Sequence, residues 1–249
     1  MDDKNPTPWL RPEWRPANRT TIVFVHGAVV EGWEMAPLRQ RLSQLGYRTR
    51  QFYYHSMLRG LDHNVDELRR FLADTEGETL HVVGHSMGGV LIRHVFEQTP
   101  DPRPGRLVAI GSPFIDCWIG RRVNRFHPRL GRLLIGQTVF DHISRPADII
   151  WRGTRDFGVI AGTYRFGIAA IFPSHPNPTD GVVLLDETRL QGIHDTITFK
   201  LNHFGMLLSK RCTAEIACFL VTGKFGQDAS KEPPVAAVNH HPTNSPALR

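Results

Sequence analysis

The sequence predicts an α/β fold in which helices flank an open, mostly parallel sheet. Three observations predict it. Short apolar strands alternate with helical patterns, and one strand runs straight into a glycine-rich turn followed by a helix. A length of 249 residues with 41% hydrophobic content also suffices for one large core. In such folds the parallel strands end at one edge of the sheet, where ligands bind.

The expected elements follow one another along the chain. Strands are recognised by runs of β-branched and aromatic residues, and helices by apolar positions three or four residues apart. The expected strands are 21–25, 47–53, 80–83, 106–110, 148–151, 157–161 and 196–199. The expected helices are 33–45, 65–72 and 90–96. After Pro113 the alternation breaks, and a helical but glycine-interrupted segment runs to about residue 145.

Both ends of the chain are expected to lie outside one domain formed by residues 20–225. Residues 1–19 contain four prolines and predict an extended N-terminal arm, whereas 226–249 are polar and proline-rich, which predicts a disordered tail. No apolar run reaches the roughly 18 residues of a membrane span. No apolar stretch that could serve as a secretion signal follows the polar first residues, so we expect a cytoplasmic protein.

Composition disfavours several classes of partner and cofactor. The net charge of +6 is not accompanied by a nucleic-acid-binding motif, so we expect no nucleic-acid partner. Cys117, Cys212 and Cys218 are expected to be unpaired thiols, and no group of cysteines and histidines has metal-ligand spacing. We therefore expect neither a metal nor a cofactor.

Ser86 is the candidate nucleophile. It is the serine of the G-x-S-x-G sequence Gly84-His85-Ser86-Met87-Gly88, between the apolar strand 80–83 and the helix pattern 90–96. A serine on a sharp strand-to-helix turn needs neighbours without side chains, and the two glycines supply them.

A serine hydroxyl is a poor nucleophile at neutral pH, so it needs a base and a third group that orients the base. Asp180 lies in the turn-like sequence Pro178-Thr179-Asp180-Gly181-Val182-Val183. His203 lies 23 residues later, just after the expected strand 196–199. These two residues are the candidate acid and base.

The order Ser86, Asp180, His203, with His26-Gly27-Ala28 after the first strong strand, resembles the α/β-hydrolase fold. Within that fold it is similar to bacterial lipases and esterases that have an H-G-x oxyanion turn. The resemblance covers roughly residues 20–222. It implies an open sheet with a catalytic triad at the carboxyl edge.

The resemblance also implies a role for each residue. Ser86 would be the nucleophile, His203 the general base and then acid, and Asp180 the residue that orients His203. The backbone N–H groups of Ala28 and Met87 would form the oxyanion hole.

Two other residues compete for these roles. His194 is the nearest rival as the base, but it precedes the last strand, where the family places no base. Asp156 follows a strand-like segment in a G-x-x-D pattern found at the acid position of many relatives. Asp180 is preferred because Asp156 lies 47 residues before His203, which is an unusually long gap. Two further histidines are expected to flank the mouth of the site: His26 and His85.

Residues 115–145 are a candidate cap or lid over the site. They contain six arginines and two aspartates, and apolar residues in 115–134 recur at spacings of three or four. The segment could form a basic cap helix with its arginines in water, or a surface that meets lipid or steers anionic acyl substrates. Gly120, Pro128 and Gly131 argue against one continuous helix and would allow a hinged lid.

Together these features predict a carboxylic ester hydrolase, an esterase or a lipase, that acts through an acyl-enzyme. The substrate would be a small-molecule or lipid ester. Thioesterase, amidase and acyltransferase activities use the same triad and are the nearest alternatives. Haloperoxidase or lyase chemistry is disfavoured, and a non-catalytic interaction or membrane-surface protein is the alternative from a different class.

Overall fold

The computed structural model describes the greater part of the chain. The described residues are 11–16, 19–126, 131–145, 150–167 and 177–226. Residues 1–10, 17–18 and 227–249 of the expected arm and tail lie outside them. Within the arm, η1 (Pro12–Trp14) is a single helical turn. Trp14 packs against the core, and its carbonyl oxygen accepts a hydrogen bond from the Tyr47 hydroxyl at 3.2 Å.

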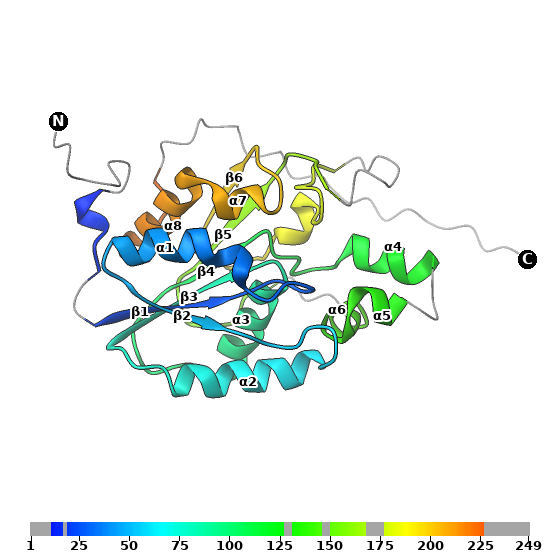
Figure 1. Ribbon diagram of the computed structural model, residues 1–249, viewed down its shortest axis with the longest axis horizontal. Coiled ribbons are helices and arrows are strands. Elements are labelled where there is room, and N and C mark those ends of the chain that lie inside the picture. Colours follow the sequence, from blue (N-terminus) through cyan, green and yellow to red (C-terminus); the bar gives the residue numbers. More distant parts are fainter. Residues whose placement is uncertain (1–10, 17–18, 127–130, 146–149, 168–176, 227–249) are drawn as a thin grey trace, which may run out of the picture.

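A parallel six-stranded sheet lies at the centre of the molecule, in the order β2-β1-β3-β4-β5-β6 (Figure 1). All five pairs of neighbouring strands are parallel. The strands are β1 (Thr20–Val25), β2 (Arg48–Phe52), β3 (Thr79–His85), β4 (Leu107–Ile110), β5 (Phe157–Gly162) and β6 (Asp195–Phe199). The prediction of an open parallel sheet is confirmed.

Helices cover both faces of this sheet. The principal helices are α1 (Ala36–Gln44), α2 (Leu61–Ala73), α3 (Met87–Gln98), α7 (Gly205–Leu208) and α8 (Lys210–Thr222). Two helical turns, η2 (Trp33–Met35) and η4 (Leu185–Thr188), lie in loops. None of the helices in the described ranges is long and apolar enough to cross a membrane.

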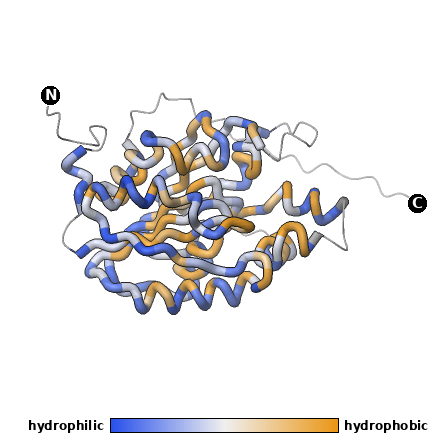
Figure 2. Tube along the Cα trace, in the orientation of Figure 1, coloured by the Kyte–Doolittle hydropathy of each residue, from blue (hydrophilic) through white to orange (hydrophobic). Residues whose placement is uncertain are grey.

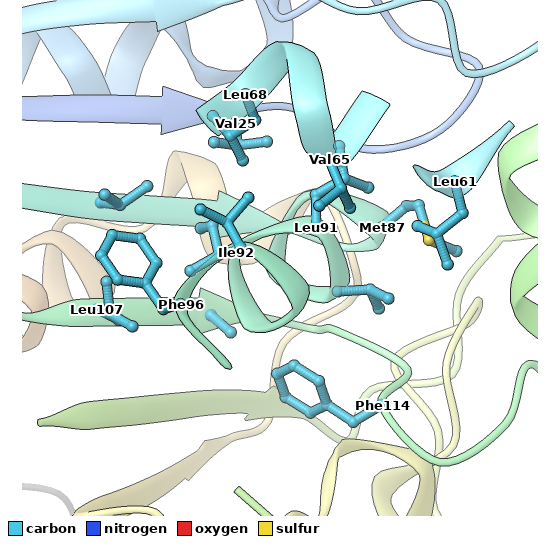
Figure 3. Close-up of a cluster of buried hydrophobic side chains, with 14 of the residues drawn as sticks. Val25, Leu61, Val65, Leu68, Met87, Leu91, Ile92, Phe96, Leu107 and Phe114 are labelled. Carbon is cyan, nitrogen blue, oxygen red and sulfur yellow. The ribbon is translucent and has the colours of Figure 1, made fainter. Parts of the chain in front are cut away.

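The alternation of side chains along each strand divides the core in two. In β1, Val23 and Val25 point into a cluster shared with α2 and α3, to which Leu68 and Leu91 contribute (Figure 3). The intervening residues, including Phe24, point into a second cluster with α1 and α8. Figure 2 shows the result as apolar strands enclosed by helices that alternate between apolar and polar residues.

One expected strand and one expected helix differ from the structure. Of the expected strand 148–151, the described residues are Ile150, which makes an isolated bridge with Gln191, and Trp151. Trp151 does not belong to a strand. An apolar residue stands at this position because the Trp151 ring is buried against Phe157, with centroids 4.9 Å apart. The expected helix 33–45 is divided into η2 and α1.

The fold brings several loops to the carboxyl edge of the sheet. β1 leads into residues 26–28, β3 into Ser86 and β4 into Gly111. Asp180 lies between β5 and β6, and His203 follows β6. Parallel pairing therefore gathers these residues at one edge.

Candidate active site

Ser86 occupies a strained turn between β3 and α3. Its φ is 53° and its ψ is −124°, a conformation that residues with a side chain rarely adopt. Its N–H donates to the Ile110 carbonyl oxygen at 2.8 Å, which ties the turn to the end of β4. A β-carbon on Gly88 would lie 2.2 Å from the Val25 carbonyl oxygen, so only glycine fits there. The turn presents a half-buried Ser86 at the carboxyl edge.

His203 and Asp180 form a buried pair. His203 Nδ1 lies 2.7 Å from Asp180 Oδ2, and the His203 N–H donates to the Asp180 carbonyl oxygen at 2.9 Å. Oδ1 of Asp180 accepts the N–H groups of Val182 and Val183 at 2.9 and 2.8 Å. Because the carboxylate acts only as an acceptor, Nδ1 of His203 carries the proton, and Nε2 keeps its lone pair.

The turn and the buried pair lie next to each other. A β-carbon placed on Gly111, directly after β4, would lie 3.1 Å from Nδ1 of His203 and 3.0 Å from Oδ2 of Asp180. His85, the residue before Ser86, has its ring centroid 4.5 Å from that of His203. The structure thus brings Ser86, His203 and Asp180 to one place.

The expected oxyanion turn faces Ser86. A β-carbon on Gly27 would lie 3.1 Å from the β-carbon of Ser86. Val29 has a φ of 68°, and its N–H donates to Ser56 Oγ at 3.0 Å, which fixes the end of the turn. Ala28 lies within this turn, and Met87 is the first residue of α3.

His26 has a structural position beside this turn. Its Nε2 accepts the Tyr54 N–H at 3.2 Å, so Nδ1 carries the proton and donates to the Gly27 carbonyl oxygen at 2.7 Å. The Tyr54 ring stacks on it with centroids 4.2 Å apart. Burial lowers the pKa of His26, which keeps the ring neutral.

His85 directly precedes Ser86 in the chain, and its ring lies against that of His203. Its Nε2 is 3.3 Å from the His203 carbonyl oxygen, and its side chain is buried. Burial, followed by the neighbouring His203, lowers the pKa of His85 well below its usual value. A neutral His85 can therefore donate to that carbonyl, while its Nδ1 has no hydrogen-bond partner among the described residues.

The two competing residues are not near Ser86. Asp156 immediately precedes β5, so it lies at the amino edge of the sheet, about one strand length or roughly 20 Å from the carboxyl edge. There its carboxylate accepts Arg106 Nε at 2.9 Å and lies 2.8 Å from Nε2 of His194. The structure brings these two residues to each other and not to His203.

Glu187 is a buried residue of this region that the sequence did not single out. Its carboxylate accepts the N–H of Leu184 at 2.8 Å and the N–H of Trp118, and its carbonyl oxygen accepts the N–H of Phe114 at 2.8 Å. Burial raises its pKa to about 8. Glu187 therefore joins the loop of Asp180 to residues 114–118. The burial of Glu187 could not be predicted from the sequence, because the residues around it have no pattern that distinguishes them from an ordinary loop.

The described residues of the segment 115–145 form three short helices. They are α4 (Trp118–Phe126), α5 (Gly131–Ile135) and α6 (Gln137–Ile143), grouped at the end of the molecule opposite η1 (Figure 1). Gly120 lies inside α4, Gly131 begins α5, and Pro128 is outside the described residues. Asp141 of α6 accepts the Leu61 N–H at 3.0 Å, which fastens α6 to the start of α2.

No cluster of three or more histidine, cysteine or carboxylate side chains in the described ranges could hold a metal ion. The three cysteines are free thiols, as expected.

Comparison with known proteins agrees with this fold. Residues 22–211 match the model of the alpha/beta hydrolase family. No curated protein matches the sequence.

Several solved structures are similar to the chain. The lipase BlEst2 from Bacillus licheniformis is 14% identical, with a TM-score of 0.60 over 82% of this chain and 92% of that one. Carboxylesterase CesB from Bacillus subtilis is 13% identical, with a TM-score of 0.53 over 84% and 85%. A lipase-esterase related protein from Clostridium acetobutylicum is 11% identical, with a TM-score of 0.54 over 80% and 91%.

At such identities the solved structures show a shared fold, whereas the family model matches most of the sequence. The chain belongs to the alpha/beta hydrolase family.

Proposed function

We propose that this hydrolase cleaves carboxylic esters through a triad of Ser86, His203 and Asp180. The observation that carries the proposal is the buried hydrogen bond of 2.7 Å between His203 and Asp180, beside a serine on a strained turn. It fixes the tautomer in which Nε2 of His203 can accept a proton. The similar solved structures include a lipase and a carboxylesterase, which favours an ester as the substrate.

In the first half-reaction Ser86 Oγ attacks the ester carbonyl carbon while His203 Nε2 takes the hydroxyl proton. The tetrahedral oxyanion accepts hydrogen bonds from the backbone N–H groups of Ala28 and Met87. Each of these bonds stabilises the transition state by about 3 kcal/mol. Asp180 stabilises the positive charge on His203. Collapse breaks the ester C–O bond, and the alcohol leaves with the proton from His203.

In the second half-reaction water attacks the acyl-enzyme. His203 Nε2 takes a proton from the water, and the same two N–H groups hold the new oxyanion. Collapse breaks the bond to Ser86 Oγ, which regains its proton from His203 and releases the carboxylic acid. No further reactant is needed.

The test is the hydrolysis rate for p-nitrophenyl esters from acetate to palmitate. We expect Ser86→Ala and Asp180→Asn to lower kcat by about 10⁴-fold or more. Asp156→Asn is the matched control, because it removes a carboxylate at the opposite edge, and its kcat should stay within about twofold of the parent. The acyl chain giving the highest rate separates esterase from lipase activity.

A fluorophosphonate probe distinguishes the remaining outcomes. Labelling of Ser86 without hydrolysis of any ester in the series would support the nucleophile but overturn the ester substrate, and thioesters and amides would then be tested. Neither labelling nor hydrolysis would overturn catalysis by Ser86 and favour an interaction protein on the same fold.

A further inference from the structure

Exposed apolar side chains are concentrated at the carboxyl edge of the sheet. In the described part of the chain 12 large apolar side chains are exposed. All but Ile150 and Val221 lie in α5, in α7 or in loops and turns that follow the carboxyl ends of strands. An apolar surface of this kind on one side of a protein marks an interaction site.

One part of this surface lies beside the oxyanion turn. Val29 is 63% exposed and Leu58 is 79% exposed, and Ser56 Oγ accepts the Val29 N–H. The carbonyl oxygen of Met57 accepts the N–H of Gln137 at 3.1 Å, so this loop meets the start of α6. The preceding helix, α5, adds Leu133 and Leu134, which are 69% and 52% exposed.

The other part lies beside the buried pair. Phe204 is 46% exposed, and its ring centroid is 5.5 Å from that of His203. Phe166 is 65% exposed, and its backbone lies against Gly181, the residue after Asp180. We call the apolar rim the set of Val29, Leu58, Leu133, Leu134, Phe166 and Phe204. It flanks the candidate site on both sides.

Positive charge accompanies the apolar rim at the end formed by α4 and α5. Arg121 and Arg125 are exposed on α4, and Arg132 is exposed on α5 next to Leu133. Figure 2 shows both apolar and polar residues on these helices. Of the two aspartates of the segment, Asp116 pairs with Arg121, and Asp141 faces the start of α2. The surface therefore combines exposed leucines with an excess of arginines.

We propose that the apolar rim docks on an anionic lipid surface. Leu133 and Leu134 would enter the boundary between headgroups and acyl chains, and the arginines of α4 and α5 would contact the anionic headgroups. This arrangement points Ser86 toward the lipid, so an ester could reach the site without crossing water. The charge of the arginines favours lipid over an uncharged apolar partner. The choice of a lipid ester as substrate rests on the proposed function, whereas the docking itself does not.

The test uses the full chain carrying Ser86→Ala, so that binding is measured without hydrolysis. Co-sedimentation of the protein is measured with two kinds of vesicle. One consists of phosphatidylcholine alone, and the other of phosphatidylcholine and phosphatidylglycerol in equal amounts. We expect binding about tenfold tighter to the anionic vesicles, and weaker as salt is raised. The vesicle experiment tests docking alone, whereas the p-nitrophenyl esters test ester hydrolysis. Failure of one proposal can therefore be distinguished from failure of the other.

Variants assign the binding to the rim. Adding Leu133→Ser and Leu134→Ser together should weaken binding to anionic vesicles by about tenfold or more. Val221→Ser is the matched control, because it removes an exposed apolar side chain on α8, and it should bind as the unmodified protein does. Circular dichroism checks that each variant is folded.

Three results would overturn the proposal: equal binding to both kinds of vesicle, no binding to either, or the same loss from Val221→Ser. Self-association without lipid that the two leucine substitutions abolish would also overturn it, since the rim would then hold a second copy of the chain.

Discussion

At Gly111 the backbone passes beside both members of the buried pair. The residue has a φ of +55°, and a β-carbon there would lie within 3.1 Å of His203 Nδ1 and also meet Met206. A side chain as small as a methyl group must therefore displace the imidazole or the carboxylate. The geometry of the pair formed by His203 and Asp180 therefore depends on the glycine that directly follows β4.

We expect Gly111→Ala to lower kcat on soluble esters by about 10- to 100-fold, because a small misplacement of His203, the proposed base, is costly. The positive φ should add a loss of about 1–2 kcal/mol in the free energy of unfolding. Gly46→Ala is the matched control, since Gly46 has a φ of +104° and, among the described residues, its β-carbon would meet only Pro16, at 3.7 Å. The control should lose stability and retain kcat. Equal kcat in both variants would contradict the role of Gly111.

At this scale the sequence predicted the three residues that the structure brings together, because each lies next to a motif with a chemical reason. Gly111 and Glu187 were not predicted. Their importance comes from contacts with residues far along the chain, and no local pattern records such contacts. The same limit applies to His26, which was expected at the mouth of the site but is held inside by Tyr54.

Among the elements, α4 depends on Glu187 for its position. The Glu187 carboxylate accepts the N–H of Trp118, the first residue of the helix, and also the N–H of Leu184 in the loop of Asp180. A buried carboxyl thus links α4 to the loop of the candidate active site that holds Asp180. Because its pKa is raised to about 8, its protonation contributes to stability.

We expect Glu187→Gln to change how stability depends on pH. Between the ordinary pKa of 4.5 and about 8, the folded protein keeps a proton on Glu187 that the unfolded chain releases. The free energy of unfolding of the parent should therefore fall as pH rises through this window, by up to about 1.4 kcal/mol per pH unit from this group. Glutamine cannot titrate, so urea unfolding at several pH values should show a shallower fall. Parallel curves for the two proteins would contradict the assignment.

Whether Asp156 can lie near His203 depends on where a single strand begins. The apolar sequence that includes Ile150 and Trp151 resembles a strand, which would put Asp156 after its carboxyl end. In the structure β5 begins at Phe157, so Asp156 lies before the strand. An apolar residue stands at position 151 because it fills the core shared with α2 and α3. Hydrophobic periodicity alone does not distinguish such a buried loop residue from a residue in a strand.

For the molecule as a whole, burial of histidines sets the response to acid. In the described part of the chain, burial lowers the pKa of five histidines, to about 3 for His81 and about 4 for His94. The other three are His26, His85 and His142. All five stay neutral in the folded protein at a pH where the unfolded chain binds protons.

The free energy of unfolding should therefore fall as pH is lowered from about 6.5 toward 4, with His81 and His94 each contributing up to about 1.4 kcal/mol per pH unit. His94→Gln removes one of these groups and should make the fall shallower. Urea unfolding at pH 7 and pH 5 measures the difference. An unchanged dependence would show that His94 does not contribute.

The general architecture was predictable because hydrophobic periodicity and short connections are local properties. The alternation of short apolar strands with helical patterns indicated parallel βαβ units, whereas the order of the strands in the sheet was not predicted. The division of residues 115–145 into three helices was less accessible. Gly120 is tolerated inside α4, whereas Gly136, with a φ of 84°, separates α5 from α6.

The hydrogen bond between Asp180 and His203 also provides a spectroscopic signal. The Nδ1 proton is enclosed between the side chains of Asp180 and His203, which are 2% and 4% exposed, so we expect its exchange with bulk water to be slow. A proton in a short bond to a carboxylate resonates far downfield of the backbone amides. A one-dimensional proton NMR spectrum can therefore report the fraction of molecules in a preparation with an assembled pair, before any substrate has been found.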